Sequence, residues 1–265
     1  MKKQKNKERI IYYTSELNDD FAGTSIKNKK TIDENYVYIH KCWVWKLCSF
    51  ILYRVIAMPI VSIFCWVKYW TKIKNRKVLK PYKKDGYFMY ANHTLMAGDA
   101  FHPNMVNANK RTYILVNPDA VSIKGVKTLV EMLGGMPVAT TLSGSRLLNK
   151  ALKIRVVDEK QVVMIFPEAH IWPYCTKIRN FKSSSFRYPV ELNVPAFCYT
   201  TIFKKRKLFK KPKVEIYVDG PFFAPEELSM KEQEKWLRDA IYEKMNERSK
   251  LSNCTYIDYR EKIYD

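Results

Sequence analysis

GYFMYANHTLMAGD, residues 86–99, contains a short aromatic and apolar run that ends at Asn92 and His93. A run of this kind, bounded by a glycine and by polar residues, is typical of a buried β-strand. Four other runs share its character, at residues 111–117, 161–167, 194–203 and 213–220. The stretches 121–133 and 144–156 between them are long enough for crossover helices. Strands that alternate with helices predict an α/β fold with a mostly parallel sheet flanked by helices.

Composition divides the chain into three regions. Residues 1–35 are polar, rich in lysine and without periodicity, which predicts a basic flexible arm. Residues 36–75 contain the most apolar part of the sequence and predict helices that associate with a membrane interface. Residues 76–265 hold the α/β pattern and form the predicted main domain. We expect its last element to be an amphipathic helix that opens near residues 225–227, where a proline precedes two glutamates, and ends near Arg248.

Residues 42–70 are dominated by apolar and aromatic side chains. A helix needs about 20 largely apolar residues to cross a bilayer. The longest uncharged run here covers residues 55–67 and contains Pro59, which favours one or two helices that lie in the interface. Two alternatives remain open. A span over residues 47–67 would place Arg54 near the bilayer centre at a cost of ~2.5–3.5 kcal/mol, and a pair of buried core helices would also tolerate a long apolar stretch.

The chain is strongly basic, with 47 Lys and Arg residues against 26 Asp and Glu and a formal net charge of +21. Such a charge attracts anionic partners. Two runs without a carboxylate, 72–84 and 204–213, carry seven positive side chains each. Taken singly, such a run is typical of a solvated loop, but the first follows the membrane-associated segment, where each cation near an anionic leaflet contributes about 1 kcal/mol. We therefore expect an anionic membrane surface as a partner, with the protein held peripherally or monotopically on the cytoplasmic face of the cell membrane.

The six cysteines are irregularly spaced and include no CxxC pair. A chain of this size needs no disulfide staples, so we expect reduced thiols in a cytosolic compartment. The basic amino-terminal residues are not followed directly by an apolar run with a small-residue cleavage site, and we expect no export. The sequence contains no HExxH motif, no paired cysteines and no glycine-rich nucleotide loop. It therefore predicts no metal and no bound cofactor.

Two of the four histidines lie where predicted strands end. His93 follows the first strand, and Asp99 comes six residues later. A carboxylate at that place can accept a hydrogen bond from the Nδ1–H group of the imidazole, which leaves Nε2 free to act as a general base. The alternative is a structural histidine whose ring nitrogens are satisfied within the fold. The second, His170, closes the strand-to-loop stretch FPEAH, residues 166–170, at a place where parallel sheets commonly build sites.

These residues resemble the sequence blocks of the PlsC-like glycerolipid acyltransferases, also called lysophospholipid acyltransferases. Asn92, His93 and Asp99 resemble the first block, NHx4D. The later blocks are matched in order by Gly135-Met136-Pro137-Val138 for the second, by Phe166-Pro167-Glu168 for the third, FPEGTR, and by Val194-Pro195 for the fourth. The order and the intervals agree over roughly residues 80 to 220, and the apolar, cationic segment ahead of them is similar to the membrane-docking helices of the family.

The resemblance implies an enzyme that transfers a fatty acyl group from a thioester to a hydroxyl group of a lysophospholipid-like acceptor. Acyl-CoA or acyl carrier protein is the expected co-substrate, and 1-acyl-glycerol-3-phosphate is the first expected acceptor. His93 is then the general base and Asp99 the group that orients it. The same resemblance implies substrate-binding roles for Asn92, Phe166, Pro167, Glu168 and His170.

The sequence departs from the family pattern in ways that leave the acceptor open. His93 and Asp99 are separated by five residues rather than four, so the loop must bulge for the carboxylate to reach the imidazole. The arginine expected after Val138 is absent, and residues 169–171 are AHI where the third block has GTR. The arginines of the family are thought to grip the acceptor's phosphate, for which a bidentate guanidinium is well suited.

Four cations near the motifs could replace these arginines, although each also fits an ordinary surface charge: Arg146, Lys177, Arg179 and Lys182. Without the motif arginines, a different hydroxylated acceptor or a glycolipid remains an alternative. A non-catalytic alternative is a basic protein that binds membranes or nucleic acid through its two basic runs. It accounts for the charge but not for the histidine, aspartate and Phe-Pro-Glu blocks, and we expect no specific nucleic acid partner.

Overall fold

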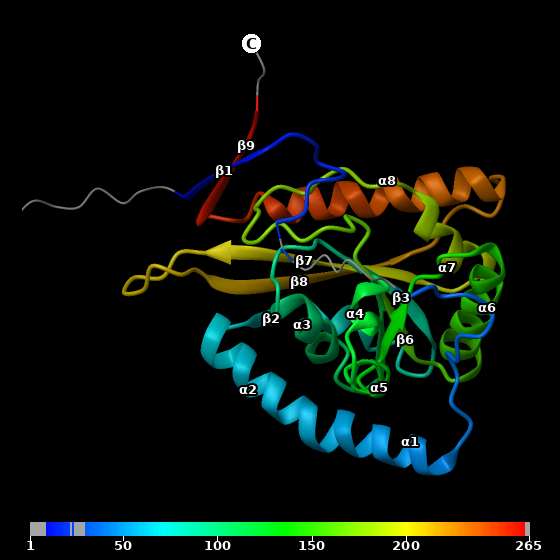
Figure 1. Ribbon diagram of the computed structural model, residues 1–265. Helices are drawn as coiled ribbons and strands as arrows, with labels where there is room; N and C mark the ends of the chain where they lie inside the picture. Colours follow the sequence, from blue (N-terminus) through cyan, green and yellow to red (C-terminus); the bar gives the residue numbers. More distant parts are fainter. Residues whose placement is uncertain (1–8, 22, 24–29, 263–265) are drawn as a thin grey trace, which may run out of the picture.

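The computed structural model describes residues 9–21, 23 and 30–262. Its core is a seven-stranded sheet in the order β2-β8-β7-β3-β6-β4-β5 (Figure 1). The strands are β2 Lys72–Lys74, β3 Tyr87–Ala91, β4 Thr112–Val116, β5 Gly135–Pro137, β6 Val162–Ile165, β7 Ala196–Lys204 and β8 Lys213–Phe222. Neighbouring strands are parallel apart from β7 and β8, which form an antiparallel hairpin. The predicted α/β fold with a mostly parallel sheet is confirmed, and the five predicted strands are present.

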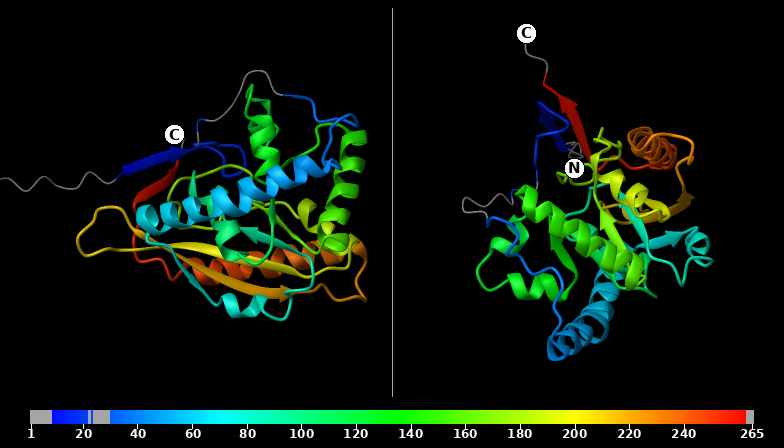
Figure 2. Two further views of the ribbon diagram at one scale, coloured as in Figure 1. Left: turned by 90° about the horizontal axis from the view of Figure 1, so that it is seen from below. Right: turned by 90° about the vertical axis from the view of Figure 1, so that its right-hand side faces the viewer.

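Helices cover both faces of the sheet (Figures 1 and 2). In chain order they are α1 Trp43–Phe50, α2 Met58–Tyr69, α3 Gly98–Val106, α4 Asp119–Ser122, α5 Lys127–Met132, α6 Leu142–Lys153, α7 Arg187–Glu191 and α8 Met230–Ser249. The predicted helix 121–133 is two short helices, α4 and α5, separated by a turn in which Gly125 has a φ of 80°. α8 begins later than expected because Ser229 and Glu232 form a capping box immediately before and within its first turn.

β3 is buried on both faces because its side chains alternate between two hydrophobic cores. Phe88 and Tyr90 belong to the core that α6 and α8 also line. Met89 and Ala91 belong to the core that α2 and α3 line. A strand covered by helices on both sides needs an apolar residue at every position. The unbroken apolar run after Gly86 therefore places the end of β3, and His93 beyond it, at the centre of the sheet.

α1, a π-helical turn Ile51–Ala57 and α2 form one continuous helix, Trp43–Tyr69, of 27 residues. Within the part of the chain that the structure describes, it is the one helix long and apolar enough to cross a membrane, judged by length and composition. Only 11% of its most apolar 18-residue stretch is buried, which contradicts the alternative of a pair of buried core helices. Side chains on its outer face are 61–72% exposed, namely Trp43, Val55, Ile60, Ile63 and Trp66. The helix therefore presents an apolar face suited to docking on a membrane.

The inner face of this helix contacts the protein. Ser49, Tyr53 and Cys65 are buried there. Arg54 also reaches the protein, since its guanidinium donates to the carbonyl of Ala108. The charge that lies in the middle of the apolar sequence is thus held by the fold.

The amino-terminal arm is docked over its described residues. β1 Arg9–Tyr13 pairs in parallel with β9 Ile257–Glu261, and the rings of Tyr13 and Tyr259 lie 4.7 and 4.9 Å from the ring of Trp172. Ile32 is fully buried in the main core. The expectation of a flexible arm is corrected for these residues, because apolar side chains among the lysines provide contacts that the overall polarity conceals. Residues 1–8 and 24–29 of the expected arm lie outside the described residues.

Candidate active site

The turn after β3 brings His93 and Asp99 together. Nδ1 of His93 lies 2.8 Å from Oδ2 of Asp99. The Asp99 side chain is 1% exposed and the His93 side chain 16%. Among the described residues, none bonds to Nε2 of His93, and this nitrogen is not enclosed. A buried carboxylate that accepts from Nδ1–H leaves Nε2 as the basic nitrogen.

Four of the five intervening residues form the loop before α3, and the fifth, Gly98, begins that helix. The backbone N–H of Asp99 donates to the carbonyl of Leu95 at 2.8 Å, and Oδ2 of Asp99 accepts from the N–H of Leu95 at 2.8 Å. α3 begins at Gly98, where an added Cβ would lie 2.8 Å from Cβ of Leu95 and 3.0 Å from Cε1 of His102. The loop bulges as its length requires, and the glycine lets the helix start close enough for the carboxylate to reach the imidazole.

The Phe-Pro-Glu segment after β6 lies against His93. The ring of Phe166 stacks on the imidazole, with centroids 4.3 Å apart and planes inclined by 20°. Oε2 of Glu168 accepts a hydrogen bond from the backbone N–H of His93 at 2.9 Å. The structure thus joins the histidine, the aspartate and the Phe-Pro-Glu turn, while their catalytic and binding roles remain predictions.

Glu168 is one half of a buried ion pair. Its Oε2 lies 2.9 Å from Nη2 of Arg179, and its Oε1 accepts from the backbone N–H of Arg179 at 2.9 Å. The two side chains are 2% and 1% exposed. The guanidinium also donates to the carbonyl of His170 and lies 4.8 Å from the ring of Trp172. Arg179 is an internal partner of Glu168, and Glu168 holds the His93 main chain. The substrate-binding roles expected for these two residues stay predictions.

Asn92 is also buried, with 2% of its surface exposed. Its amide nitrogen donates to the carbonyl of Thr201 at 3.0 Å, and its amide oxygen accepts from the Thr201 N–H at 2.8 Å. These bonds extend the pairing of β3 with β7 by one residue. Both polar groups of the Asn92 side chain are thus engaged with the backbone, and its predicted role in substrate binding stays a prediction.

The remaining predicted site residues lie further out. Arg146 is exposed on α6 and forms no hydrogen bond or ion pair with the His93 group in the described ranges. His170 has a side chain that is 33% exposed, with Nδ1 3.9 Å from Oδ2 of Asp20. Pro167 is half-buried between the stacked phenylalanine and Glu168. The structure brings His170 and Pro167 to the same loop as Glu168 and leaves Arg146 on a separate helix.

The other two histidines support the fold. His102 is fully buried, with Nε2 3.0 Å from Oγ1 of Thr71, and burial lowers its pKa to about 4. His40 stacks on Trp45 with ring centroids 4.0 Å apart. In residues 9–21, 23 and 30–262, no group of three or more His, Cys, Asp or Glu side chains is placed to hold a metal ion.

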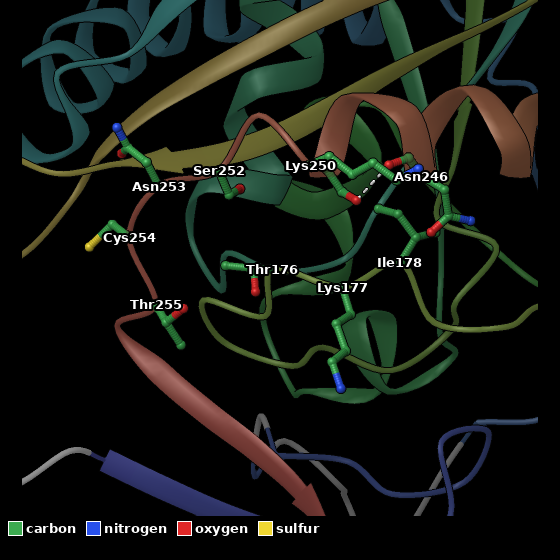
Figure 3. Close-up of a pocket in the computed structure, with 10 residues that line it drawn as sticks. Thr176, Lys177, Ile178, Asn246, Lys250, Ser252, Asn253, Cys254 and Thr255 are labelled. Atoms are coloured by element: carbon green, nitrogen blue, oxygen red, sulfur yellow. Dashed lines mark hydrogen bonds between the residues drawn. The ribbon is translucent and has the colours of Figure 1, made fainter.

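One hollow of the described surface is separate from His93. It measures about 470 Å³ and lies between residues 176–178 and the chain that follows α8 (Figure 3). Lys177 and Lys250 line it together with small and polar side chains. None of the residues that line it belongs to the His93 group, so its size carries no argument about the acyl-transfer chemistry.

His93 is held through its main chain by residues that the sequence did not single out. The N–H of Trp172 donates to the carbonyl of His93 at 3.1 Å, and the N–H of Tyr174 donates to the carbonyl of Thr94 at 2.8 Å. The hydroxyl of Thr94 donates to the carbonyl of Cys175 at 3.0 Å. The cluster of large residues in IWPYC, 171–175, was the available signal that this loop is packed inside the protein.

Comparisons with known proteins agree with this geometry. Residues 71–201 match the family model described as Acyltransferase. The fold is similar to the crystal structure of the 1-acyl-sn-glycerophosphate (LPA) acyltransferase, PlsC, from Thermotoga maritima, with a TM-score of 0.53 and 18% identity over 77% of this chain and 87% of that chain. No curated protein matches the sequence. The match assigns residues 71–201 to an acyltransferase domain, which supports an acyltransferase enzyme. The likeness of the fold to PlsC agrees with the resemblance to the PlsC-like acyltransferases that the sequence blocks indicate.

Proposed function

We propose that the protein transfers a fatty acyl group from a thioester, acyl-CoA or acyl carrier protein, to a hydroxyl group of a lysophospholipid-like acceptor. The observation that carries the proposal is the 2.8 Å contact between His93 and Asp99 at the carboxyl end of β3, with Nε2 open to a ligand. Loops at the carboxyl ends of parallel strands commonly build the sites of α/β proteins. The family match over residues 71–201 supports the reaction class.

In this reaction Nε2 of His93 takes the proton of the acceptor hydroxyl as its oxygen attacks the thioester carbonyl. Asp99 keeps Nδ1 protonated and stabilises the imidazolium that forms. The tetrahedral intermediate then collapses: the C–S bond breaks, the new ester bond remains, and the departing thiolate takes the proton from the imidazolium. General base catalysis typically contributes about 10²–10⁴-fold to such a rate.

Phe166 and Glu168 position the base in this scheme. The stacked ring of Phe166, 4.3 Å from the imidazole, restricts rotation of His93. Glu168 fixes the His93 backbone through the 2.9 Å bond to its N–H. A catalytic group that is held in one orientation loses less entropy on reaching the transition state. The Phe-Pro-Glu segment therefore acts on the substrate through His93.

We propose 1-acyl-glycerol-3-phosphate as the first acceptor to test, since the similar Thermotoga maritima protein is described as a 1-acyl-sn-glycerophosphate acyltransferase. Arg179 is engaged with Glu168, so the acceptor's phosphate would need other cations. A different hydroxylated acceptor or a glycolipid is the alternative product to look for. The apolar face of helix Trp43–Tyr69 and the net charge of +21 support an anionic membrane, at its cytoplasmic face, as the place where the lipid is met.

The test is the release of free thiol from acyl-CoA and from acyl carrier protein, with mass spectrometry of products from a mixed pool of lysolipids and other hydroxylated acceptors. We expect release that depends on an acceptor and falls by about 10²-fold or more in His93→Ala. Vesicle binding should be unchanged in that variant, and the rates are compared at a temperature where both variants are folded. His40→Ala is the matched control, because the His40 side chain is 24% exposed against 16% for His93 and stacks on Trp45, outside the site.

Equal turnover by His93→Ala and by the parent chain would remove the mechanism. If the parent chain bound vesicles and nucleic acid but released no thiol with any acceptor, the non-catalytic basic protein would be the better description. A product other than phosphatidate would retain the mechanism and replace the acceptor.

A further inference from the structure

The loop that joins β7 to β8, residues 205–212, is apolar at its tip and is called the hairpin loop below. Leu208 is 91% exposed, more than any other large apolar side chain of the described residues. Phe209, beside it, is 54% exposed. Two adjacent apolar side chains with this exposure form a patch that is open to a partner outside the chain.

Cations surround this tip. Lys205, Lys207, Lys210 and Lys211 are exposed and form no ion pair among the described residues. The run 204–213 contains no carboxylate. An apolar tip surrounded by lysines suits an anionic bilayer, because the apolar groups can enter the acyl region while the ammonium groups stay with the phosphates.

The hairpin loop touches the end of the helix Trp43–Tyr69. The ring of Phe209 lies 5.9 Å from that of Trp70, and the guanidinium of Arg206 lies 4.9 Å from the Trp70 ring. In Figure 1 and in the left view of Figure 2, the loop continues the line of α2 beyond its carboxyl end. Trp66 and Trp70 are 70% and 50% exposed. The apolar face of the helix therefore extends as far as the hairpin loop.

We propose that the hairpin loop is a second membrane-insertion element, which places Leu208 and Phe209 in an anionic phospholipid bilayer beside the helix Trp43–Tyr69. The loop lengthens the apolar contact and adds positive charge at the end of the helix. Because β7 pairs directly with β3, it also ties the strand that leads to His93 to the membrane surface. This element is additional to the proposed reaction and is separable from it.

A bilayer accounts for both the exposed apolar tip and the surrounding lysines of the hairpin loop, whereas nucleic acid accounts for the lysines alone. Phosphates of either kind could meet the lysines. Leu208, however, offers neither a hydrogen bond nor an aromatic face on which a base could stack. Phe209 already contacts Trp70. The exposed leucine at the tip is the observation that favours lipid.

The apolar part of the proposal is tested by binding of the full chain to phosphatidylcholine vesicles that contain phosphatidylglycerol. We expect Leu208→Ser combined with Phe209→Ser to weaken binding about tenfold or more. Leu142→Ser is the matched control, since Leu142 is 76% exposed and belongs to α6 rather than to the hairpin loop or the helix Trp43–Tyr69, and we expect it to leave binding unchanged. An equal loss in both variants, or no loss in either, would overturn the proposal.

The charged part is tested by comparing vesicles with and without phosphatidylglycerol. Lys207→Gln combined with Lys210→Gln should weaken binding about tenfold, and only where the anionic lipid is present. Lys231→Gln combined with Lys235→Gln should leave it unchanged, because α8 lies across the sheet from the docking helix in Figure 1. If the hairpin variant instead lost binding to a DNA duplex and kept its affinity for vesicles, nucleic acid would replace the bilayer as the partner.

Insertion itself is tested with an environment-sensitive fluorophore on Leu208→Cys. The three accessible cysteines, Cys42, Cys48 and Cys254, would be replaced by serine, and the other three are buried. We expect the emission to shift to the blue on vesicle binding and to be quenched by spin-labelled lipid tails. Emission that stays as in water while the chain is bound would overturn the proposal. None of these measurements uses acyl transfer, so a failure here is distinct from a failure of the proposed reaction.

Discussion

Replacing Arg179 with methionine would leave Glu168 without its buried counter-ion. The two side chains are 1% and 2% exposed, and Nη2 and Oε2 lie 2.9 Å apart. Removing one partner of such a pair costs about 3–5 kcal/mol, because the remaining charge stays out of water. Glu168 would keep its bonds from the backbone N–H groups of His93 and of residue 179. We therefore expect the free energy of unfolding to fall by about 3 kcal/mol, the lower end of that cost. The whole free energy of unfolding of a domain is typically about 5–15 kcal/mol.

The assay is urea unfolding of the full chain, together with initial rates of thiol release at a temperature where both variants are folded. Since Glu168 positions His93, kcat should fall while KM for the acceptor changes little. Adding Glu168→Gln to Arg179→Met removes the unpaired charge. The free energy of unfolding of this double variant should be about 0.5–3 kcal/mol higher than the value obtained by adding the losses of the two single variants. A loss below about 1 kcal/mol in Arg179→Met would show that water reaches Glu168 and would refute the reasoning.

Three further changes test the local structure. Burial lowers the pKa of His102 from 6.5 to about 4, so between these pH values the unfolded chain binds a proton that the folded chain does not. The free energy of unfolding should therefore fall as the pH falls from 6.5 to 4, by up to about 1.4 kcal/mol per pH unit. In His102→Asn, urea unfolding measured over this pH range should show a smaller dependence on pH. Ala169 has a φ of 62°, and Ala169→Gly should raise the free energy of unfolding by about 0.5–1 kcal/mol, since relief of the left-handed strain exceeds the added entropy of the unfolded chain. Gly98→Ala should lower the free energy of unfolding by about 1–3 kcal/mol, because the added Cβ clashes with Leu95. The same change should slow thiol release by displacing Asp99. An unchanged rate would show that the start of α3 tolerates a side chain.

The strands at the centre of the sheet could be predicted because each is covered on both faces. β3 and β6 are apolar at every position, and such a run stands out in any sequence. β1, β2, β5 and β9 have three to five residues each and lie at the edges of their sheets. β1, β2 and β9 include exposed lysines or arginines, and β5 has only the residues Gly-Met-Pro. None of the four has the unbroken apolar run that marks β3 and β6. α3 was missed because it begins at a glycine and contains Pro103, which both weaken a helical pattern.

The His93–Asp99 contact could be expected because the two residues lie on one turn, where spacing limits how far apart they can be. The Glu168–Arg179 pair could not, because 11 positions of irregular loop separate the two and no periodicity relates them. The sequence made Arg179 a candidate for an external anion on charge alone. Its burial is decided by contacts with Trp172 and with the carbonyl of His170, which exist only once the loop is folded.

Trp172 connects the candidate active site to both ends of the chain. Its ring packs between Tyr13 on β1 and Tyr259 on β9, at 4.7 and 4.9 Å, and its backbone N–H donates to the carbonyl of His93 at 3.1 Å. The same ring lies 4.8 Å from the Arg179 guanidinium. The paired terminal strands therefore hold the loop that holds His93, although they lie outside the region 71–201 that matches the family. The proposed base is therefore fixed in position by residues outside the family blocks as well as by residues within them.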